Sequence, residues 1–278
     1  MGIRYCQHWP DHPDLSGLII ENREDSNSDH AVLILHGFTG TPASVASLVE
    51  DLYEAGLSVF TPALPGHAEI TPAALCDVTF SDWLDFVRQL YAQLRSQYKF
   101  VSVVGLSLGA VLANLLLGEA VPPDRSIFLA IPYALPDRSA EWLLPVIMLL
   151  PGSKRLVWDK GEPSISDATA RATPLSYSWT PLSSVNELRK GFKQLRRHPI
   201  STTTPKLFIH SNSDTTASIE GARIIADRSG PATQFVELTK SYHVLTRDVE
   251  KEAIARLVTA FICSPADPLP LKDDWNAS

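Results

Sequence analysis

The sequence predicts an α/β fold in which a mostly parallel sheet is flanked by helices and interrupted late by a helical insertion. Three observations predict it. Short, apolar, β-branched runs recur along the chain, amphipathic helical segments separate them, and this alternation stops over residues 132–204 before it resumes. Strands that alternate with helices at this spacing form parallel sheets with right-handed crossovers, because each helix carries the chain back to the starting edge.

The N-terminal half contains short apolar runs that predict strands and longer amphipathic runs that predict helices. Residues 44–55 have helical spacing and end at Gly56, whereas the helix expected over 80–94 begins with Ser81 as its N-cap. A strand buried in a parallel sheet is continuously apolar. Runs of this kind are, in order, 18–20 as an edge strand, 31–35, 57–60 and 100–104.

The C-terminal half first continues this alternation and then breaks it. Residues 132–204 contain many prolines, three tryptophans, two helical stretches and no convincing strand, and we expect this segment over the carboxyl ends of the strands. The other expected elements are the helix 106–117, the strand 126–130, the strand 206–210, the helix 218–228, the strand 234–238 and the helix 248–262.

The composition suits one large core with an inserted subdomain. The chain has 278 residues, of which 45% are hydrophobic, and this is enough to bury a sizeable core. We expect residues 1–131 and 205–263 to form the core and residues 132–204 to form a helical cap. Residues 264–278, with three prolines, are expected to form an irregular tail.

The charge and hydropathy patterns exclude several classes of function. The 31 acidic and 24 basic residues give a net charge of −7 and form no basic patch, so a nucleic-acid partner is not expected. The longest apolar run, 142–150, is far below the ~20 residues of a membrane helix, and no signal peptide is expected. Cys6, Cys76 and Cys263 lack metal-ligand spacing. We expect a cytoplasmic protein, monomeric or weakly dimeric, without metal or cofactor.

Residues 100–118 carry the pattern with the clearest chemistry. Between a predicted strand and a predicted helix lies Gly105-Leu106-Ser107-Leu108-Gly109, a G-x-S-x-G motif. A turn this sharp forces its apex into strained backbone angles, and the flanking glycines remove Cβ atoms that would collide. Ser107 then stands clear of the sheet ahead of a helix N-terminus. This context favours a nucleophile elbow over a structural turn with an idle serine.

A serine nucleophile requires a base and a carboxylate that orients the base. Of the eight histidines, His243 lies in the loop between the last strand and the last helix, at the edge where open α/β sheets carry their sites. The acid is expected one strand earlier, which selects Asp214. Asp124 would approach the sheet from the opposite end. The order Ser107, Asp214, His243 is the order expected in this class of fold.

The other histidines have simpler interpretations. His36 and His67 are expected to hold loops through hydrogen bonds, and His210 is expected to be buried and neutral at a strand end. Solvated positions are expected for His8, His12, His30 and His198.

A tetrahedral intermediate needs two hydrogen-bond donors aimed at its oxyanion. The N–H of Leu108 follows from the elbow itself. The N–H of Phe38 is the natural second donor, because the glycines of HGFTG at 36–40 let the backbone approach a substrate. The alternative is that HGFTG is an ordinary glycine turn.

These motifs together resemble those of the serine α/β-hydrolases, and within them the bacterial carboxylesterase and monoacylglycerol lipase group. The resemblance covers about residues 31–262 and extends to the order and spacing of the motifs. It departs at Ala68 and Ala110, where relatives often carry glycine, and neither position touches a reacting atom. The motifs that carry it are HGFTG at 36–40, LPGH at 64–67, GLSLGA at 105–110, the loop containing Asp214, and SYHV at 241–244.

The resemblance implies an α/β-hydrolase fold with an eight-stranded type of sheet and a mobile helical cap inserted after strand six. It implies hydrolysis of short- to medium-chain carboxylic esters or monoacylglycerols through an acyl-serine, with EC class 3.1.1 and no cofactor. The family's nucleophile corresponds to Ser107, its acid to Asp214 and its base to His243. Its oxyanion donors correspond to Phe38 and Leu108.

Two alternatives for function use the same residues. A thioesterase or lysophospholipase differs only in the leaving group, and a ligand receptor on a hydrolase scaffold keeps the motif with little turnover. The apolar run 142–150 also has two interpretations. It either packs the cap onto itself or covers the cleft above Ser107 and receives the acyl chain.

Overall fold

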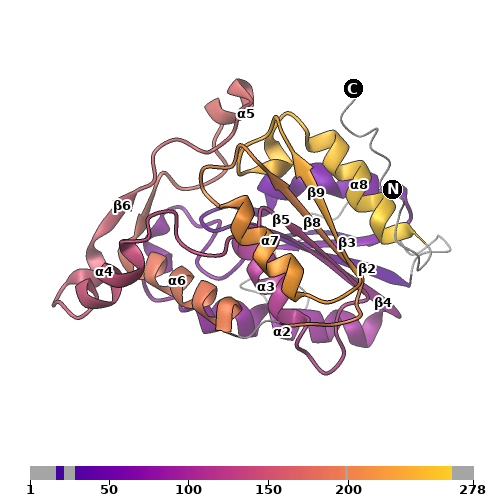
Figure 1. Cartoon of the computed structure of the whole chain (residues 1–278), viewed down its shortest axis with the longest axis horizontal. Coiled ribbons are helices and arrows are strands. Elements are labelled where there is room, and N and C mark those ends of the chain that lie inside the picture. Colours follow the sequence, from indigo (N-terminus) through magenta and orange to yellow (C-terminus); the bar gives the residue numbers. More distant parts are fainter. Residues whose placement is uncertain (1–16, 22–28, 198–199, 265–278) are drawn as a thin grey trace.

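Within residues 17–21, 29–197 and 200–264, which the computed structural model describes, the chain forms a seven-stranded sheet with helices on both faces (Figure 1). One edge strand is antiparallel and all other neighbouring pairs are parallel, which confirms the expected α/β fold. In spatial order the strands are β1 (Gly17–Ile20), β3 (Ser58–Pro62), β2 (His30–Leu35), β4 (Phe100–Leu106), β5 (Arg125–Leu129), β8 (Lys206–Ser211) and β9 (Thr233–Leu238).

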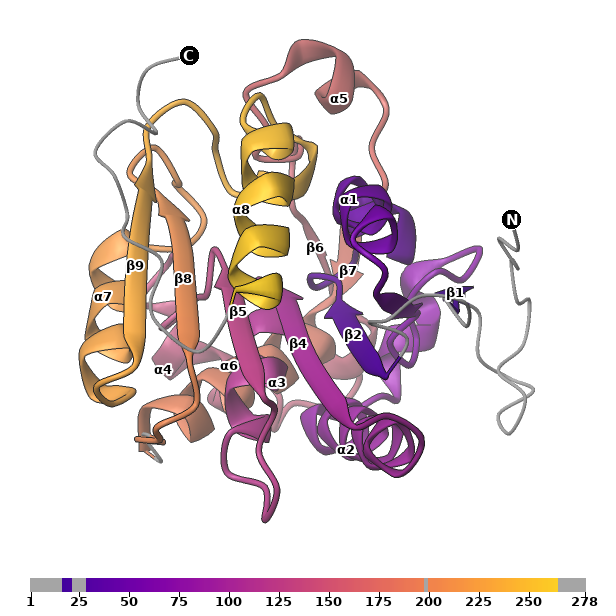
Figure 2. The ribbon, with the colours of Figure 1, turned by 90° about the vertical axis from the view of Figure 1, so that its right-hand side faces the viewer.

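The sheet divides the hydrophobic core into two layers because successive side chains of a strand point to opposite faces. In β2, Leu33 and Leu35 pack on one side, whereas Val32 and Ile34 pack on the other. In Figure 2, α1 and α8 lie together on one side of the strands. The first layer contains α2 (Phe80–Gln97), α3 (Leu108–Leu116) and α7 (Ile219–Arg228), and the second contains η1 (Pro42–Leu48), α1 (Val49–Glu54) and α8 (Lys251–Cys263).

The parallel register brings several loops to one edge of the sheet. Leu35 at the end of β2 is paired with Gly105 of β4, and Leu106 is paired with Leu129 at the end of β5. The ends of β8 and β9 are likewise paired, through Ser211 and Leu238. The HGFTG loop, the G-x-S-x-G turn and the loops after β8 and β9 therefore all leave the sheet at its carboxyl edge.

Residues 132–204, which we call the insertion, lie between β5 and β8, and Figure 1 shows α4 and β6 at one end of the molecule. The expectation of two helical stretches and no strand is wrong. The missed strands are three residues each, too short to show a periodic pattern. Its described residues form α4 (Ala140–Ile147), η3 (Ser153–Arg155), β6 (Val157–Asp159), α5 (Ala168–Ala172), β7 (Trp179–Pro181) and α6 (Leu182–Arg197), with β6 and β7 paired antiparallel.

The strand count also differs from the one that the resemblance implies. The described residues give seven strands in the main sheet instead of eight, and the insertion follows the fifth of them along the chain instead of the sixth. The first described strand is the antiparallel edge strand β1, and residues 1–16 and 22–28, on either side of it, lie outside the described part. The expected irregular tail lies almost wholly outside it as well.

Two expected helix ends can be compared with the structure. Gly56 follows the end of α1 and has a φ of 86°, which confirms its expected role as the residue that ends this helix. The expected N-cap of α2 is wrong: the cap is Thr79, whose side chain accepts from the N–H of Asp82 while Asp82 accepts from the N–H of Thr79. This reciprocal pair outcompetes Ser81 because it satisfies two N–H groups at once.

No helix in the described part of the chain combines the length and the apolar character needed to cross a bilayer. Cys76 and Cys263 are free thiols, and Cys6 lies outside the described residues.

One expected solvated histidine is in fact packed into the fold. The Nε2 atom of His30 lies 2.9 Å from the Ser102 hydroxyl, and its ring lies against Phe100. The error arises because His30 is the first residue of β2 rather than part of the polar segment before it. His8, His12 and His198 lie outside the described residues.

We expect the free energy of unfolding to fall as the pH drops from 6.5 to 4. Burial lowers the pKa of His30 to about 4, that of His36 to about 4 and that of His67 to about 3. The unfolded chain binds protons at these sites from about pH 6.5 downward while the folded chain does not, so stability is present above pH 6.5 and is lost below it. Each histidine contributes a slope of up to about 1.4 kcal/mol per pH unit.

Urea denaturation at intervals between pH 7 and pH 4.5 measures this slope. The His30→Gln variant, which keeps a hydrogen-bonding group beside Ser102 but does not titrate, should show a shallower decline than wild type. A urea midpoint that stays constant over this interval would contradict the prediction.

Candidate active site

Ser107 occupies a strained turn between β4 and α3. Its φ of 54° and ψ of −113° lie outside the regions that L-residues favour, which confirms the expected strain at the apex. The turn is held on both sides: the N–H of Ser107 donates to Leu129 O at 2.9 Å, and Ser107 O accepts from Ala110 N at 2.9 Å. The surrounding backbone therefore fixes the serine.

The two glycines of the motif are required by close backbone contacts. A Cβ on Gly105 would lie 2.2 Å from Gly109 O, and a Cβ on Gly109 would lie 2.1 Å from Leu35 O. The turn is thus wedged between the start of its own helix and the end of β2. No other residue fits either position without moving the backbone.

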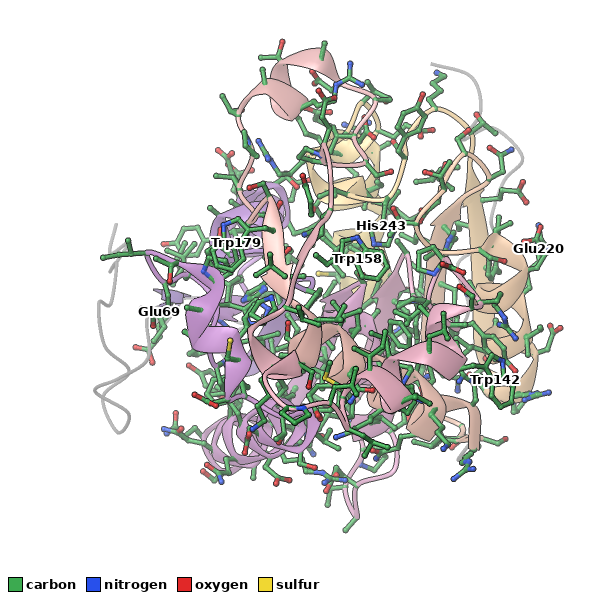
Figure 3. All side chains as sticks on the ribbon, turned by 90° about the vertical axis from the view of Figure 1, so that its left-hand side faces the viewer. Glu69, Trp142, Trp158, Trp179, Glu220 and His243 are labelled. Carbon is green, nitrogen blue, oxygen red and sulfur yellow. The ribbon has the colours of Figure 1, made fainter. Side chains whose placement is uncertain are left out.

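The structure brings together the three residues expected to act on a substrate. The Nδ1 atom of His243 lies 2.7 Å from Asp214 Oδ2, and Nε2 lies 2.9 Å from Ser107 Oγ. Because the carboxylate only accepts, Nδ1 carries the proton and Nε2 is free to accept the proton of the serine hydroxyl. Figure 3 shows His243 beside Trp158 of the insertion in this view.

The side chain of Asp214 is fully buried and is held by donors on several sides. Its Oδ1 accepts from the N–H groups of Thr216 at 2.8 Å and Ala217 at 2.9 Å. Burial alone would raise the pKa of Asp214, but the charge of His243 and hydrogen bonds from His210, His243 and Ala217 outweigh it and hold the pKa well below its ordinary value. The carboxylate therefore stays ionised and keeps the imidazole in one orientation.

The two expected oxyanion donors lie beside the serine. The position of a Cβ on Gly37 is 3.3 Å from Ser107 Cβ, so the HGFTG loop lies directly against the elbow. Gly40 N donates to Gly37 O at 3.0 Å, and this hydrogen bond closes a tight turn that contains Phe38 and its N–H. Among the described residues, neither this N–H nor that of Leu108 has an acceptor, which leaves both available to a ligand.

The loop-holding roles expected for His36 and His67 are confirmed. His36 Nε2 accepts from Leu64 N at 3.0 Å, and its Nδ1 donates to Gly37 O at 2.9 Å. His67 Nδ1 donates to Pro65 O at 3.1 Å. Both buried rings thus fix the loops behind Phe38. His210 is buried as expected.

Sequence reasoning missed Asp248, which ties the loop of His243 to the insertion. We expected it to begin the last helix, but it precedes α8 and is fully buried. Burial would raise its pKa, yet the hydrogen bonds outweigh burial and lower it. Its carboxylate accepts from the N–H groups of Tyr242 (2.7 Å), Ser166 (2.8 Å), Val249 (2.8 Å) and Asp167 (3.0 Å) and from the Ser166 hydroxyl (2.5 Å).

Asp248→Asn is expected to lower the free energy of unfolding by about 2–4 kcal/mol, because the amide –NH₂ would face N–H donors and leave them unpaired. We also expect kcat for ester hydrolysis to fall at least about tenfold at temperatures well below melting, because Tyr242, next to His243, loses its anchor. Urea denaturation and initial rates measure the two effects. Asp137→Asn, an exposed carboxylate in the insertion, is the matched control. Equal stability of the two variants would contradict this role.

A cavity of about 950 Å³ opens above Ser107 and His243, between the core and the insertion. Figure 3 shows Trp158, which lines it, close to His243 in the view, and Trp142 far from both. Other apolar residues of its wall include Phe38, Leu135, Ile165, Val185, Leu188 and Phe192.

Of the two interpretations of the run 142–150, the one in which it covers the cleft is wrong, since none of these residues lines the cavity. In α4, Ala140 and Leu144 lie one turn apart and face inward, which turns the rest of the run outward. Trp142 and Leu149 are each 82% exposed. The run is therefore mostly surface in this structure.

The described residues contain no group of three His, Cys, Asp or Glu side chains placed to hold a metal ion. The chemistry available at this edge of the sheet is that of a hydroxyl, an imidazole, a carboxylate and two backbone N–H groups.

Comparison with known proteins places the chain among hydrolases. Residues 32–257 match the family model described as "Alpha/beta hydrolase family". The chain is 30% identical to a thermostable monoacylglycerol lipase of Bacillus sp. (strain H-257) over 92% of this chain and 98% of that protein. It is 27% identical to a carboxylesterase of Bacillus subtilis (strain 168) over 84% and 92%. A soluble variant of monoglyceride lipase from Saccharomyces cerevisiae, 13% identical, superposes with a TM-score of 0.74 over 89% of this chain and 91% of that one.

Proposed function

This chain belongs to the alpha/beta hydrolase family, and we propose that it is a serine hydrolase that cleaves carboxylic esters through an acyl-Ser107 intermediate. The observation that supports this most strongly is the unbroken series of hydrogen bonds from Asp214 through His243 to Ser107, at the floor of the cavity. Two relatives that align over most of the chain are named for ester hydrolysis. The substrates proposed are short- to medium-chain acyl esters or monoacylglycerols.

In the proposed first half-reaction, Ser107 Oγ attacks the ester carbonyl carbon while His243 Nε2 takes the hydroxyl proton. The carbonyl oxygen becomes an oxyanion, which the N–H groups of Phe38 and Leu108 stabilise. Asp214 stabilises the imidazolium that forms. The intermediate collapses as the carbon–oxygen bond to the alcohol breaks, and His243 gives its proton to the departing alkoxide.

In the second half-reaction water replaces the alcohol. His243 removes a proton from the water as its oxygen attacks the acyl carbon, and the oxyanion forms again at the same two N–H groups. Collapse releases the carboxylic acid, and the proton returns from His243 to Ser107 Oγ. The cycle consumes one water and needs no other reagent.

The insertion is proposed to act as a cap that receives the acyl chain. Trp158 lines the cavity, whereas Trp142 lies in the same insertion and is 82% exposed. Each methylene of acyl chain that Trp158 shields from water adds about 0.8 kcal/mol, close to fourfold in kcat/KM. Chain-length preference should therefore depend on Trp158 and not on Trp142.

Trp158→Ala is accordingly expected to lower kcat/KM for octanoate esters at least about tenfold and to leave acetate esters within about threefold. Trp142→Ala, the matched control, should retain the wild-type preference. A series of p-nitrophenyl esters from acetate to decanoate measures both. Parallel losses on all chain lengths in Trp158→Ala, or the same change in both variants, would count against a chain-binding role.

The same series, extended to monoacylglycerols and matched thioesters, tests the proposed function itself. Steady turnover of oxygen esters is the expected result. A preference for thioesters would favour the thioesterase alternative. A single turnover followed by a stable complex would favour a receptor that retains the hydrolase scaffold. Cell fractionation and analytical sedimentation test the proposed cytoplasmic location and the proposed monomer or weak dimer.

A further inference from the structure

Lys160 lines the same cavity as Ser107 but has no part in the proposed reaction. It follows β6 directly, and its N–H donates to Ser178 O at 2.9 Å, which continues the pairing of β6 with β7 and fixes its backbone. Its Nζ donates to the hydroxyl of Thr39, the residue after the oxyanion donor Phe38. The side chain remains accessible from the cavity. An ammonium group thus lies close to the proposed reaction centre.

Among the residues that the structure describes, this ammonium has no carboxylate partner. Within the described residues no carboxylate lies within 4.0 Å of Lys160 Nζ, and Thr39 takes only one of its three donors. Asp159 and Glu162 line the cavity too, but Asp159 is turned back to accept from Gly161 N at 2.9 Å. The cavity walls take the ammonium partly out of water and so lower the pKa of Lys160 to about 8, and it is still mostly protonated at neutral pH.

The charge of the cavity wall differs from that of the whole chain. Its cationic side chains are Lys160, Arg171 and Arg247, against Asp159 and Glu162 as its acidic ones. The chain as a whole has a net charge of −7. Arg247 is engaged with Thr173 O at 2.8 Å. The cavity wall therefore has one more cationic than acidic side chain, on a chain whose net charge is negative.

We propose that Lys160 binds an anionic group of the substrate, a carboxylate or a phosphate, and makes the enzyme prefer negatively charged esters. This inference rests on the proposed ester hydrolysis at Ser107. An anion adds direct attraction between opposite charges to the hydrogen bond that it accepts from an ammonium, whereas a neutral hydroxyl supplies the hydrogen bond alone. Lys160 is therefore better matched to an anion than to the hydroxyls of an uncharged glycerol ester. Lys160 Nζ is hydrogen-bonded to Thr39, which follows the oxyanion donor Phe38. An anion bound by Lys160 would therefore lie near the ester bond that is cleaved.

Two matched pairs of esters test the proposal and distinguish the two sides of the bond. Mono-p-nitrophenyl succinate and p-nitrophenyl butyrate differ in a negative charge on the acyl side. 1-Butyryl-glycerol 3-phosphate and 1-butyryl-glycerol differ in a negative charge on the leaving-group side. In wild type we expect the anionic member of at least one pair to have the higher kcat/KM. Added salt should reduce that preference, because it screens the attraction.

Lys160→Met is expected to lower kcat/KM for the preferred anionic ester about 10- to 100-fold and to change its neutral partner less than about threefold. Lys160→Arg should restore much of the preference. Lys154→Met, an exposed lysine of the insertion outside the cavity wall, should change neither. The salt dependence in wild type needs no variant, so the test holds even if Lys160→Met folds poorly.

Three results would overturn the proposal. Equal losses on neutral and anionic esters in Lys160→Met would mean that Lys160 only positions the oxyanion loop through Thr39. Turnover of both pairs without charge preference or salt dependence would refute the anion site and leave the proposed function intact. No turnover of any of the four esters would refute the proposed function and the inference with it.

Discussion

Ser107→Ala reduces kcat for ester hydrolysis by about 10⁶ and leaves the fold intact; this is the largest effect that we expect. The serine supplies the nucleophile of a triad, and removal of one triad member costs nearly as much as removal of all three. The change deletes one oxygen at a position held by backbone hydrogen bonds from Ala110 and to Leu129, so no contact that fixes the turn is lost. Steady-state rates and circular dichroism measure activity and fold.

Ser176→Ala is the matched control, because Ser176 also lines the cavity but lies outside the proposed triad. It should keep wild-type activity within about threefold. A folded Ser107→Ala protein that keeps more than a few per cent of wild-type activity would show that another group is the nucleophile.

Asp214→Asn is expected to reduce kcat by about 10⁴ with a smaller change in KM. An amide in place of the carboxylate can donate to His243 Nδ1, which favours the imidazole tautomer that cannot accept the serine proton. Nδ1 lies only 2.7 Å from Asp214 Oδ2, so the amide in Asp214→Asn would contact the imidazole directly. Rates at saturating and limiting ester concentrations separate the two parameters.

Asp124→Asn is the control for this change. Asp124 accepts from Val101 N at 2.7 Å and pairs with Arg95, at the end of β4 opposite Ser107. An asparagine can still accept at that position, so activity should stay close to wild type. Loss of activity in Asp124→Asn with retention in Asp214→Asn would assign the acid to the other strand.

The sheet and the three residues of the proposed triad were predictable because their signals are local. Each buried strand is a short apolar run. The residues that follow each parallel strand lie at the carboxyl edge of the sheet. Gly105 and Gly109 mark the sharp turn at Ser107 by their lack of side chains. The loops that carry Asp214 and His243 then follow from the positions of β8 and β9.

The features that were missed or wrongly predicted from the sequence depend on contacts between distant segments. Asp248 binds Ser166, which lies 82 residues away in sequence, and no local pattern shows this contact. The direction in which α4 turns its apolar residues depends on its packing against α6, so the exposure of Trp142 could not be inferred from hydropathy. β6 and β7 were missed because strands of three residues carry no periodicity.

The most direct test of the central claim is active-site titration with an alkyl fluorophosphonate, followed by peptide mass spectrometry. The reagent phosphonylates a serine that a neighbouring base activates, and the adduct resembles the tetrahedral intermediate. The account predicts one adduct per chain, located on Ser107 and absent from Ser107→Ala, with esterase activity lost in proportion to labelling. Full labelling of Ser107 with undiminished activity, or loss of activity through an adduct on another residue, would contradict it.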